Sequence, residues 1–178
     1  LAHVVEVGEH DHWPFITYEL ALSTILADRL DSKGLPGKEV VPWMMDVLQG
    51  LAFAHEAGAA HHDIQPFAIL LPPNGPARLL GLGVAMDPAP HAGGSQVSHR
   101  FASERDLAGV GLVLHHALAG TPALDQPDVS LVIDHLPPMG REIVRLPWST
   151  SHPVPEALRA IVNRATDRQE RQRYHNAR

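Results

Sequence analysis

The sequence predicts a mainly helical α+β domain with two small β-hairpins. Three observations lead to this class. Apolar residues recur at the 3.6-residue helical period from Lys38 to Ala57. A nearly all-apolar segment from Asp106 to Ala119 predicts a second helix that is buried on most sides. Short β-branched or apolar runs separated by turn residues predict hairpins within residues 1–20 and 68–80.

The first third of the chain contains the first hairpin and the strongest helix. Val4–Val7 and Phe15–Tyr18 flank the turn-like segment Gly8–His12. A short helix is expected from Leu22 to Leu30, because its apolar residues follow a helical spacing. The long helix comes next, and Gly58 suits its C-terminal cap.

The middle of the chain predicts a second hairpin and then a loop. Ala68–Leu71 and Arg78–Leu80 are short apolar runs around the turn signal Pro72-Pro73-Asn74-Gly75. Residues 84–103 are rich in Pro, Gly, Ser and His and are expected to form a mobile loop. The buried helix is expected to begin at Asp106, so that this residue lies at the N-terminal end of the helix.

The last third is expected to be rich in loops before it ends in helix. A short helix is predicted at Val129–His135 within the loop-rich residues 121–153. Pro155–Ala165 has the pattern of an amphipathic helix, with its proline at the first turn. The final thirteen residues are highly charged and are expected to be helical in part.

Composition bounds the class of protein. The 178 residues suffice for one domain with a core, and the net charge of −6 argues against a general nucleic-acid binder. The chain has no cysteine, which fits a reducing cytoplasm, and no apolar run of the roughly 18 residues needed for a membrane span. Because it begins at Leu1 without a methionine, we expect a fragment of a longer protein.

One segment carries most of the functional information. His61-His62-Asp63-Ile64-Gln65-Pro66-Phe67-Ala68-Ile69-Leu70-Leu71, followed by Gly81-Leu82-Gly83, resembles the catalytic loop and metal-binding turn of a protein kinase, H-R-D-x-K-P-x-N-x-L-L and D-F-G. The spacings of five and thirteen residues between the key positions are those of the family. In family order, the catalytic Asp, Lys, Asn and metal-binding Asp positions hold Asp63, Gln65, Ala68 and Gly81.

The resemblance extends over almost the whole chain and is to the large, C-terminal lobe of bacterial Ser/Thr protein kinases. It implies that residues 1–20 are the end of the small lobe and the hinge, and that residues 21–178 are the large lobe. The further segments that carry the resemblance are Phe15–Leu20, Glu39–Gly58 with its ending Leu51-Ala52-Phe53-Ala54-His55-Glu56-Ala57-Gly58, Asp106–Gly111, Val154–Ala165 and Arg173-Tyr174.

The same resemblance implies two sets of supporting residues. Vestigial nucleotide or metal positions are Tyr18, Glu19, Ala21, Leu70 and Gly81. Structural positions are His61, Leu82, Asp106 and Arg173. Asp106 is expected to be buried and to accept backbone N–H groups near His61 and His62. His61 is expected to pack near Leu82, and Arg173 to find an unusual partner or remain solvated.

The chemistry of the family is largely missing from these positions. Gly81 and Ala68 offer no side-chain oxygen for metal ions, and Gln65 has no positive charge for the phosphate in transfer. One such preorganised group is typically worth about 3–4 kcal/mol of barrier lowering. No Gly-rich loop or strand lysine is present, and no A-P-E motif follows Gly83.

We therefore expect a catalytically impaired pseudokinase that acts as a signalling or interaction module in the cytoplasm of a bacterium. No cofactor is expected, and ATP with magnesium would bind only if the family activity persists. The alternative is an active ATP-dependent Ser/Thr kinase completed by an upstream small lobe. Protein partners and self-association are expected, because Tyr18, Leu20 and Leu70 would be exposed without that lobe. No nucleic-acid or membrane partner is expected.

A different class, the HD-type metal phosphohydrolase, is compatible with the order of His55, His62-Asp63 and Asp106. In that class the His-Asp pair lies in a helix, whereas here Pro66 follows closely and disfavours one. The pairs His10-x-His12 and His115-His116 do not amount to a zinc site, which needs three or four convergent ligands. No metal site is predicted.

Overall fold

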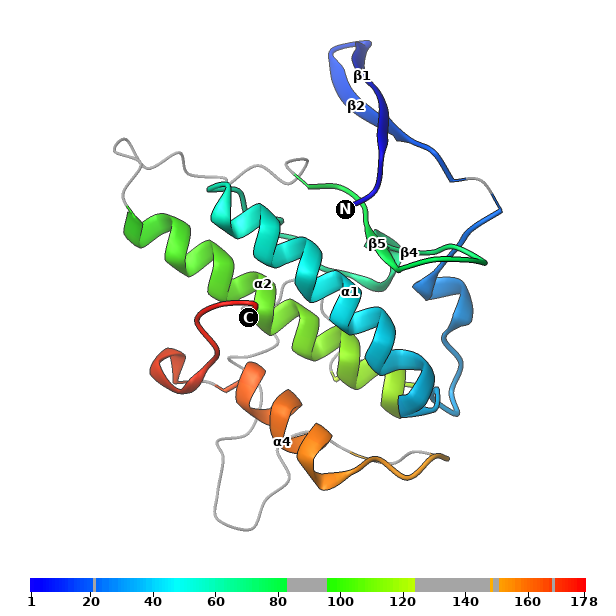
Figure 1. Ribbon diagram of the computed structural model, residues 1–178, viewed down its shortest axis with the longest axis vertical. Helices are drawn as coiled ribbons and strands as arrows, with labels where there is room; N and C mark the ends of the chain where they lie inside the picture. Colours follow the sequence, from blue (N-terminus) through cyan, green and yellow to red (C-terminus); the bar gives the residue numbers. More distant parts are fainter. Residues whose placement is uncertain (21, 83–95, 124–147, 149–150, 168) are drawn as a thin grey trace.

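The computed structural model describes residues 1–20, 22–82, 96–123, 148, 151–167 and 169–178 (Figure 1). The predicted helix at 129–135, Ala21 and Gly83 lie outside the described residues. The strands are β1 (Val4–His10), β2 (Trp13–Tyr18), β3 (Thr24–Ile25), β4 (Ile69–Leu71) and β5 (Arg78–Leu79). The α-helices are α1 (Gly37–Glu56), α2 (Gln96–Ala119) and α4 (Glu156–Ala165), and single 3₁₀ turns occupy Leu26–Arg29, Pro66–Ala68 and Glu170–Gln172.

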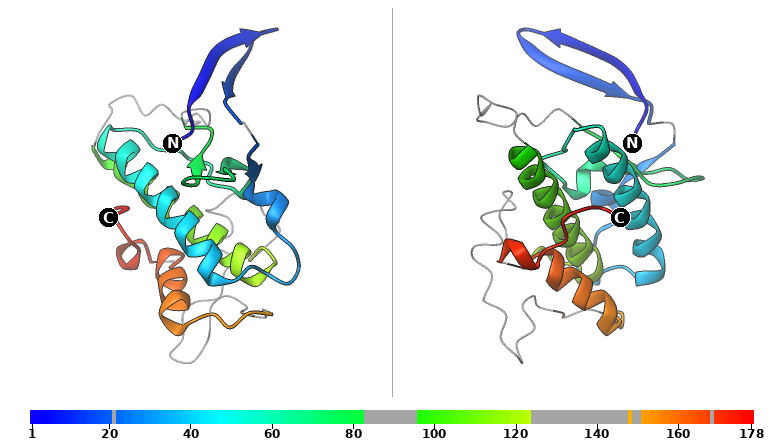
Figure 2. Two further views of the ribbon diagram at one scale, coloured as in Figure 1. Left: turned by 45° about the vertical axis from the view of Figure 1, so that its right-hand side comes forward. Right: turned by 60° about the vertical axis from the view of Figure 1, so that its left-hand side comes forward.

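The predicted N-terminal hairpin is confirmed. Strands β1 and β2 pair antiparallel and are joined by Asp11 and His12, whose φ angles of 49° and 67° are typical of a two-residue hairpin turn. A Cβ atom at Gly8 would lie 2.6 Å from the tip of the Phe15 ring, so this ring would have to move to accommodate a side chain there. The hairpin extends away from the helices in all three views (Figures 1 and 2).

The second hairpin is also confirmed, but it belongs to a three-stranded sheet in the order β3-β4-β5. The short helix predicted for Leu22–Leu30 is wrong. Thr24 and Ile25 pair instead with β4, and only Leu26–Arg29 forms a 3₁₀ turn. The two β-branched residues suit a strand, and the pairing places Leu26 at full burial in the core.

Helices α1 and α2 lie side by side and form the centre of the domain, and α4 packs against α2 (Figures 1 and 2). The 3.6-residue pattern of α1 is confirmed, because one stripe of it is buried. That stripe consists of Val40, Met44, Val47, Leu51 and Ala54. Close contact between α2 and α4 requires Gly111, where a Cβ atom would lie 2.7 Å from that of Ala165.

Helix α2 differs from its prediction at the N-terminus. It begins at Gln96, so Asp106 lies in its interior, and the predicted start at Asp106 is wrong. The prediction of a mobile loop over 84–103 fails for residues 96–103, which are helical. An (i, i+4) pair between Arg100 and the buried Glu104 stabilises these extra turns, and Ser103 is buried as well.

Helix α4 closes the domain, as the pattern of Pro155–Ala165 predicts. The segment after it runs back across α2 towards α1, where the C-terminus lies (Figures 1 and 2). Among the described residues, no helix is both long enough and apolar enough to cross a membrane.

Candidate functional site: a kinase-like catalytic loop

Asp106 is the anchor of the loop that contains Asp63. Its carboxylate is 1% exposed and accepts the backbone N–H groups of His61 and His62, each at 2.7 Å. The Nε2 atom of His55, from the last turns of α1, donates a third hydrogen bond at 2.9 Å. The expected hydrogen bonds to the loop are therefore present, although the carboxylate comes from within α2 and not from its start.

His61 connects the loop to the end of β5. It is 2% exposed, its Nδ1 accepts the N–H of Asp63 at 3.3 Å, and its Nε2 donates to the carbonyl of Leu80. His62 has a φ of 70°, a left-handed conformation that is uncommon for a side chain of this size. Together with the bonds to Asp106, these features fix the path of the backbone into Asp63.

Asp63 itself is held only through its backbone. Its side chain is half-buried, and its carboxylate makes no hydrogen bond or ion pair with any residue of the described ranges. An ionised carboxylate in this position can accept a proton from a hydroxyl group. By itself it cannot hold a phosphate, because it has the same sign of charge.

Ala68, five residues after Asp63, contributes its backbone and a methyl group. Ala68 is 4% exposed, and its N–H and carbonyl bond to Gln65 and Leu80 at 2.9 and 2.8 Å. These bonds connect the 3₁₀ turn to the β4–β5 hairpin. At this position, where kinases place a metal-binding asparagine, the structure offers a buried methyl group.

Gly81 is reached by the N-terminal hairpin. Its N–H donates to the hydroxyl of Tyr18 at 2.8 Å, so the end of β2 contacts the segment after β5. Its φ is +83°, which favours glycine, while an added Cβ would lie at an ordinary 3.6 Å from His61. Space therefore permits a side chain here, and the backbone conformation opposes it. Leu82 follows and is half-buried.

The residues predicted at nucleotide-binding positions differ in their exposure to solvent. Tyr18 is half-buried, Glu19 is exposed, and Ala21 lies outside the described residues. Leu70, expected to be exposed, is 1% exposed, and this expectation is wrong. It lies in β4, the central strand, where it pairs with Ile25 and Arg78. Leu20 is 50% exposed, as expected.

Arg173 has a partner within the C-terminal segment. Its Nε donates to the carbonyl of Asp167, a residue that is 7% exposed. The neighbouring Tyr174 lies under the guanidinium of Arg164, 4.4 Å from the ring centroid. Arg173 therefore helps to fold the segment after α4.

His55 is the functional neighbour that sequence reasoning assigned no role in the kinase-like site. Its bond to Asp106 spans 51 residues of sequence, and no local pattern announces it. The contacts of Asp106 argue against the phosphohydrolase alternative, in which its carboxylate would bind a metal ion. Both of its oxygens already accept hydrogen bonds from N–H groups. In the part of the chain that the structure describes, no three His, Cys, Asp or Glu side chains are grouped to hold a metal ion.

Comparison with known proteins finds relatives among the serine/threonine-protein kinases of bacteria. The serine/threonine-protein kinase PknL of Mycobacterium tuberculosis is 33% identical over 175 residues, covering 81% of this chain and 44% of the relative. PrkC of Bacillus subtilis is 24% identical over 194 residues, covering 99% of this chain and 29% of that protein. No protein-family model matches. The chain thus spans less than half the length of these two curated relatives.

Solved structures agree on the fold. The kinase domain of PknI from Mycobacterium tuberculosis superposes with a TM-score of 0.65, covering 100% of this chain and 68% of that one at 21% identity. A point mutant of the same PknI domain gives a TM-score of 0.68. With the Asp106-anchored loop and the two-helix core, these matches identify the chain as a protein-kinase-like domain with the architecture of the large lobe, related in sequence to bacterial Ser/Thr protein kinases.

Proposed function

We propose that this domain is catalytically impaired and acts as a signalling or interaction module. The observation that supports it most is a contrast between the Asp63 loop's anchor and the positions around it. The anchor of the loop is complete, through Asp106, His55 and the amides of His61 and His62. The three positions expected to hold metal and phosphate carry Gln65, a buried Ala68 and Gly81 with positive φ.

The expected size of the rate loss supports a severely impaired domain, because three metal- or phosphate-binding side chains are missing. Phosphoryl transfer is driven by positioning and by neutralising charge, mainly through metal ions that bridge the phosphates. Each missing electrostatic group typically costs about 3–4 kcal/mol, and losses within one site do not add. Loss of a single such group would thus lower the rate of transfer about a hundred- to a thousandfold. The Asp63 carboxylate would remain as a base, but no phosphate would be positioned for the reaction.

The test is transfer of radiolabelled phosphate from ATP, with magnesium or manganese, by the full natural chain that contains these residues. We expect no incorporation above that of Asp63→Ala, either into the protein or into a generic substrate. Incorporation that disappears in Asp63→Ala would contradict the proposal. It would support the alternative that this lobe belongs to an active ATP-dependent Ser/Thr kinase, the activity named for its relatives.

The proposed partners are proteins, including a second copy of the chain. The N-terminal hairpin supports this, because it exposes large apolar side chains on a two-stranded sheet whose edges pair with no further strand of the described residues. Those side chains are Val4, Val5, Val7 and Trp13, at 44, 64, 68 and 77% exposure. Light scattering over a concentration series checks self-association, and a strictly monomeric protein at high concentration would oppose it. A cytoplasmic location is part of the same proposal, supported by the cysteine-free sequence.

A further inference from the structure

The two ends of the molecule differ in charge. Residues 1–28 contain five acidic residues and no lysine or arginine, whereas residues 156–178 contain six arginines and three acidic residues. The N-terminal hairpin and α4 lie at opposite ends of the domain in all three views (Figures 1 and 2). The hairpin and α4 of one chain therefore do not meet, and their opposite charges can attract each other closely only between two chains.

One face of the hairpin combines apolar side chains with a carboxylate. Val7 lies opposite Ile16, and Glu9 lies opposite Pro14, two residues further along both strands. Directly opposed residues share a face, and so does every second residue along a strand. Val7 is 68% exposed, and the Glu9 carboxylate has one partner in the described ranges, the exposed ring of His12 at 3.4 Å. This face therefore presents an apolar surface beside an accessible acidic group.

The outward face of α4 has a similar composition and the opposite charge. Four exposed residues follow the spacing i, i+3, i+4 and i+7, which places them on one stripe of the helix. They are Ala157, Ala160, Ile161 and Arg164. Ile161 is 46% exposed, and the two alanines allow another element to approach the helix closely. Glu156 is also exposed, but it lies at the other end of α4, about 12 Å from Arg164 along the helix axis.

The positive charge of Arg164 has no carboxylate partner in the part of the chain that the structure describes. Its Nε donates to the carbonyl of Gln172 at 3.2 Å, and its guanidinium lies 4.4 Å from the ring centroid of Tyr174. Both contacts position the side chain, and both leave its terminal nitrogens as donors. Because a carboxylate can accept two parallel N–H groups from a guanidinium, Arg164 is suited to bind an acidic side chain of another molecule.

We propose that the chain associates head to tail, with the hairpin of one copy on the outward face of α4 of the next. Val7 packs on Ile161, and Glu9 pairs with Arg164. The spacings agree, because Glu9 follows Val7 by about 7 Å along the strand and Arg164 follows Ile161 by about 5 Å along the helix. The head-to-tail contact rests on the proposed function, because it names the two surfaces for the proposed self-association.

The proposed contact differs in its stoichiometry from a contact between two hairpins. Two hairpins would use the same surface on both copies and stop at a dimer, whereas a head-to-tail contact leaves one surface open at each end and continues unless it closes into a ring. We expect the weight-average mass of the full chain to rise beyond that of a dimer with concentration. It should be lower in about 0.5 M than in about 0.05 M sodium chloride, because salt screens the ion pair.

The test is an exchange of charges, measured by sedimentation velocity on the full chain at low ionic strength. Glu9→Arg and Arg164→Glu each place like charges at the proposed contact, and each should weaken self-association by at least about tenfold. An equimolar mixture of the two variants should associate as the unmodified protein does. Opposite charges then meet at every contact between unlike variants.

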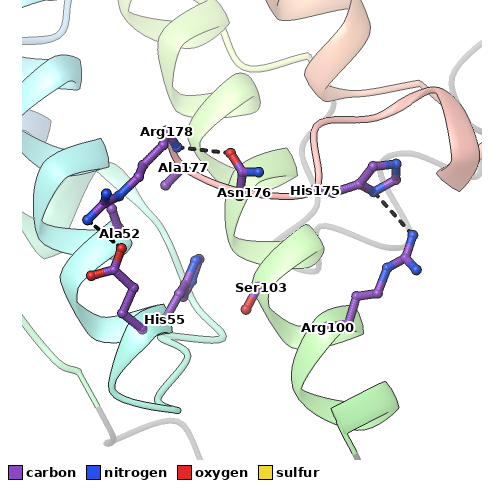
Figure 3. A pocket seen from close by; sticks show the side chains of 9 residues that line it. Ala52, His55, Arg100, Ser103, His175, Asn176, Ala177 and Arg178 are labelled. Carbon is purple, nitrogen blue, oxygen red and sulfur yellow. Dashed lines mark hydrogen bonds and ion pairs between the residues drawn. The ribbon is translucent and has the colours of Figure 1, made fainter.

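Arg178→Glu is the matched control, because it changes the net charge as much as Arg164→Glu does. Arg178 lies beside the pocket in Figure 3, where it is paired with Glu56 and is not part of α4. Trp13→Thr controls for general adhesion, because Trp13 lies opposite His10 on the other face of the hairpin. Both controls should associate as the unmodified protein does, and circular dichroism confirms that each variant is folded.

The possible outcomes separate the head-to-tail contact from the proposed function. Unchanged association of Arg164→Glu, or a mixture that does not regain association, overturns the head-to-tail contact alone. A mass that stops at a dimer has the same meaning. A strictly monomeric protein overturns both this contact and the proposed self-association. Phosphate transfer by the unmodified protein would contradict only the proposed impairment.

Discussion

The two sides of the Asp63 loop are held in different ways. On the α2 side, a buried carboxylate binds three N–H groups, and every contact depends on the Asp106 side chain. On the β4–β5 side, Ala68, Gly81 and Leu80 are connected through backbone groups, with the side chains of His61 and Tyr18 as partners. The shape of this loop therefore depends on its anchor and does not require the metal- and phosphate-binding side chains that the kinase family has at positions 65, 68 and 81.

The largest effect is expected from Asp106→Ala. The change leaves the buried N–H of His61 and the partly buried N–H of His62 without an acceptor, at a cost of about 1–3 kcal/mol for a fully buried group. We expect the free energy of unfolding in urea to fall by at least about 2 kcal/mol. Asp28→Ala, at an exposed position, is the control and should stay within about 0.5 kcal/mol. Similar values for both variants would show that the anchor is not what holds the loop.

Gly81→Asp comes next, because it restores the family's metal-binding residue on the backbone side. The φ of +83° makes any side chain strained, at about 1–2 kcal/mol, although the Cβ has room. We expect a loss of stability of this size and no gain of manganese-dependent phosphate transfer. Gly81→Ala separates the two effects, because it carries the strain without the carboxylate. A gain of transfer activity in Gly81→Asp alone would mean that one residue limits the site.

The stability of the folded protein is expected to depend on pH through His116, a residue of α2. Desolvation lowers the pKa of His116 below its usual 6.5, so the folded protein disfavours the protonated ring. The unfolded chain binds this proton more readily, and stability should therefore fall as pH drops below 6.5 towards the lowered folded-state pKa. Thermal unfolding of the unmodified protein and His116→Gln, between about pH 7.5 and 5.5, measures this term. The decrease should be smaller in the variant, and equal decreases would contradict the assignment.

The smallest effect is expected from Asp63→Ala. Its carboxylate has no bond to the described residues, so its removal should change the free energy of unfolding by no more than about 0.5 kcal/mol. Measured beside Asp106→Ala, it compares two aspartates that serve one loop. A loss as large as that of Asp106→Ala would reveal a structural role for Asp63 that its contacts do not indicate.

Local pattern determined much of the fold. Three elements could be predicted from residues that are close in sequence, because a single helix face or a single turn defines each of them. They are the helix predicted at Lys38–Ala57, the hairpin around Pro72-Pro73-Asn74-Gly75 and the helix predicted at Pro155–Ala165. The order and spacing of the family-like residues also indicated that Asp63, Gln65 and Ala68 follow one another in one loop and that Gly81 comes after the second hairpin. These features depend on neighbours in sequence, and a single chain displays them directly.

Tertiary structure decided what depends on distant neighbours. Thr24-Ile25 is a strand because β4 offers it a partner, and Leu70 is buried because β4 is central. Helix α2 begins at Gln96, with Glu104 bonded to Arg100 and, across 71 residues, to His175. The Tyr18 hydroxyl reaches Gly81 across 63 residues. Such contacts follow from how elements pack, since burial and hydrogen bonding are satisfied in three dimensions and leave no period or spacing in the sequence.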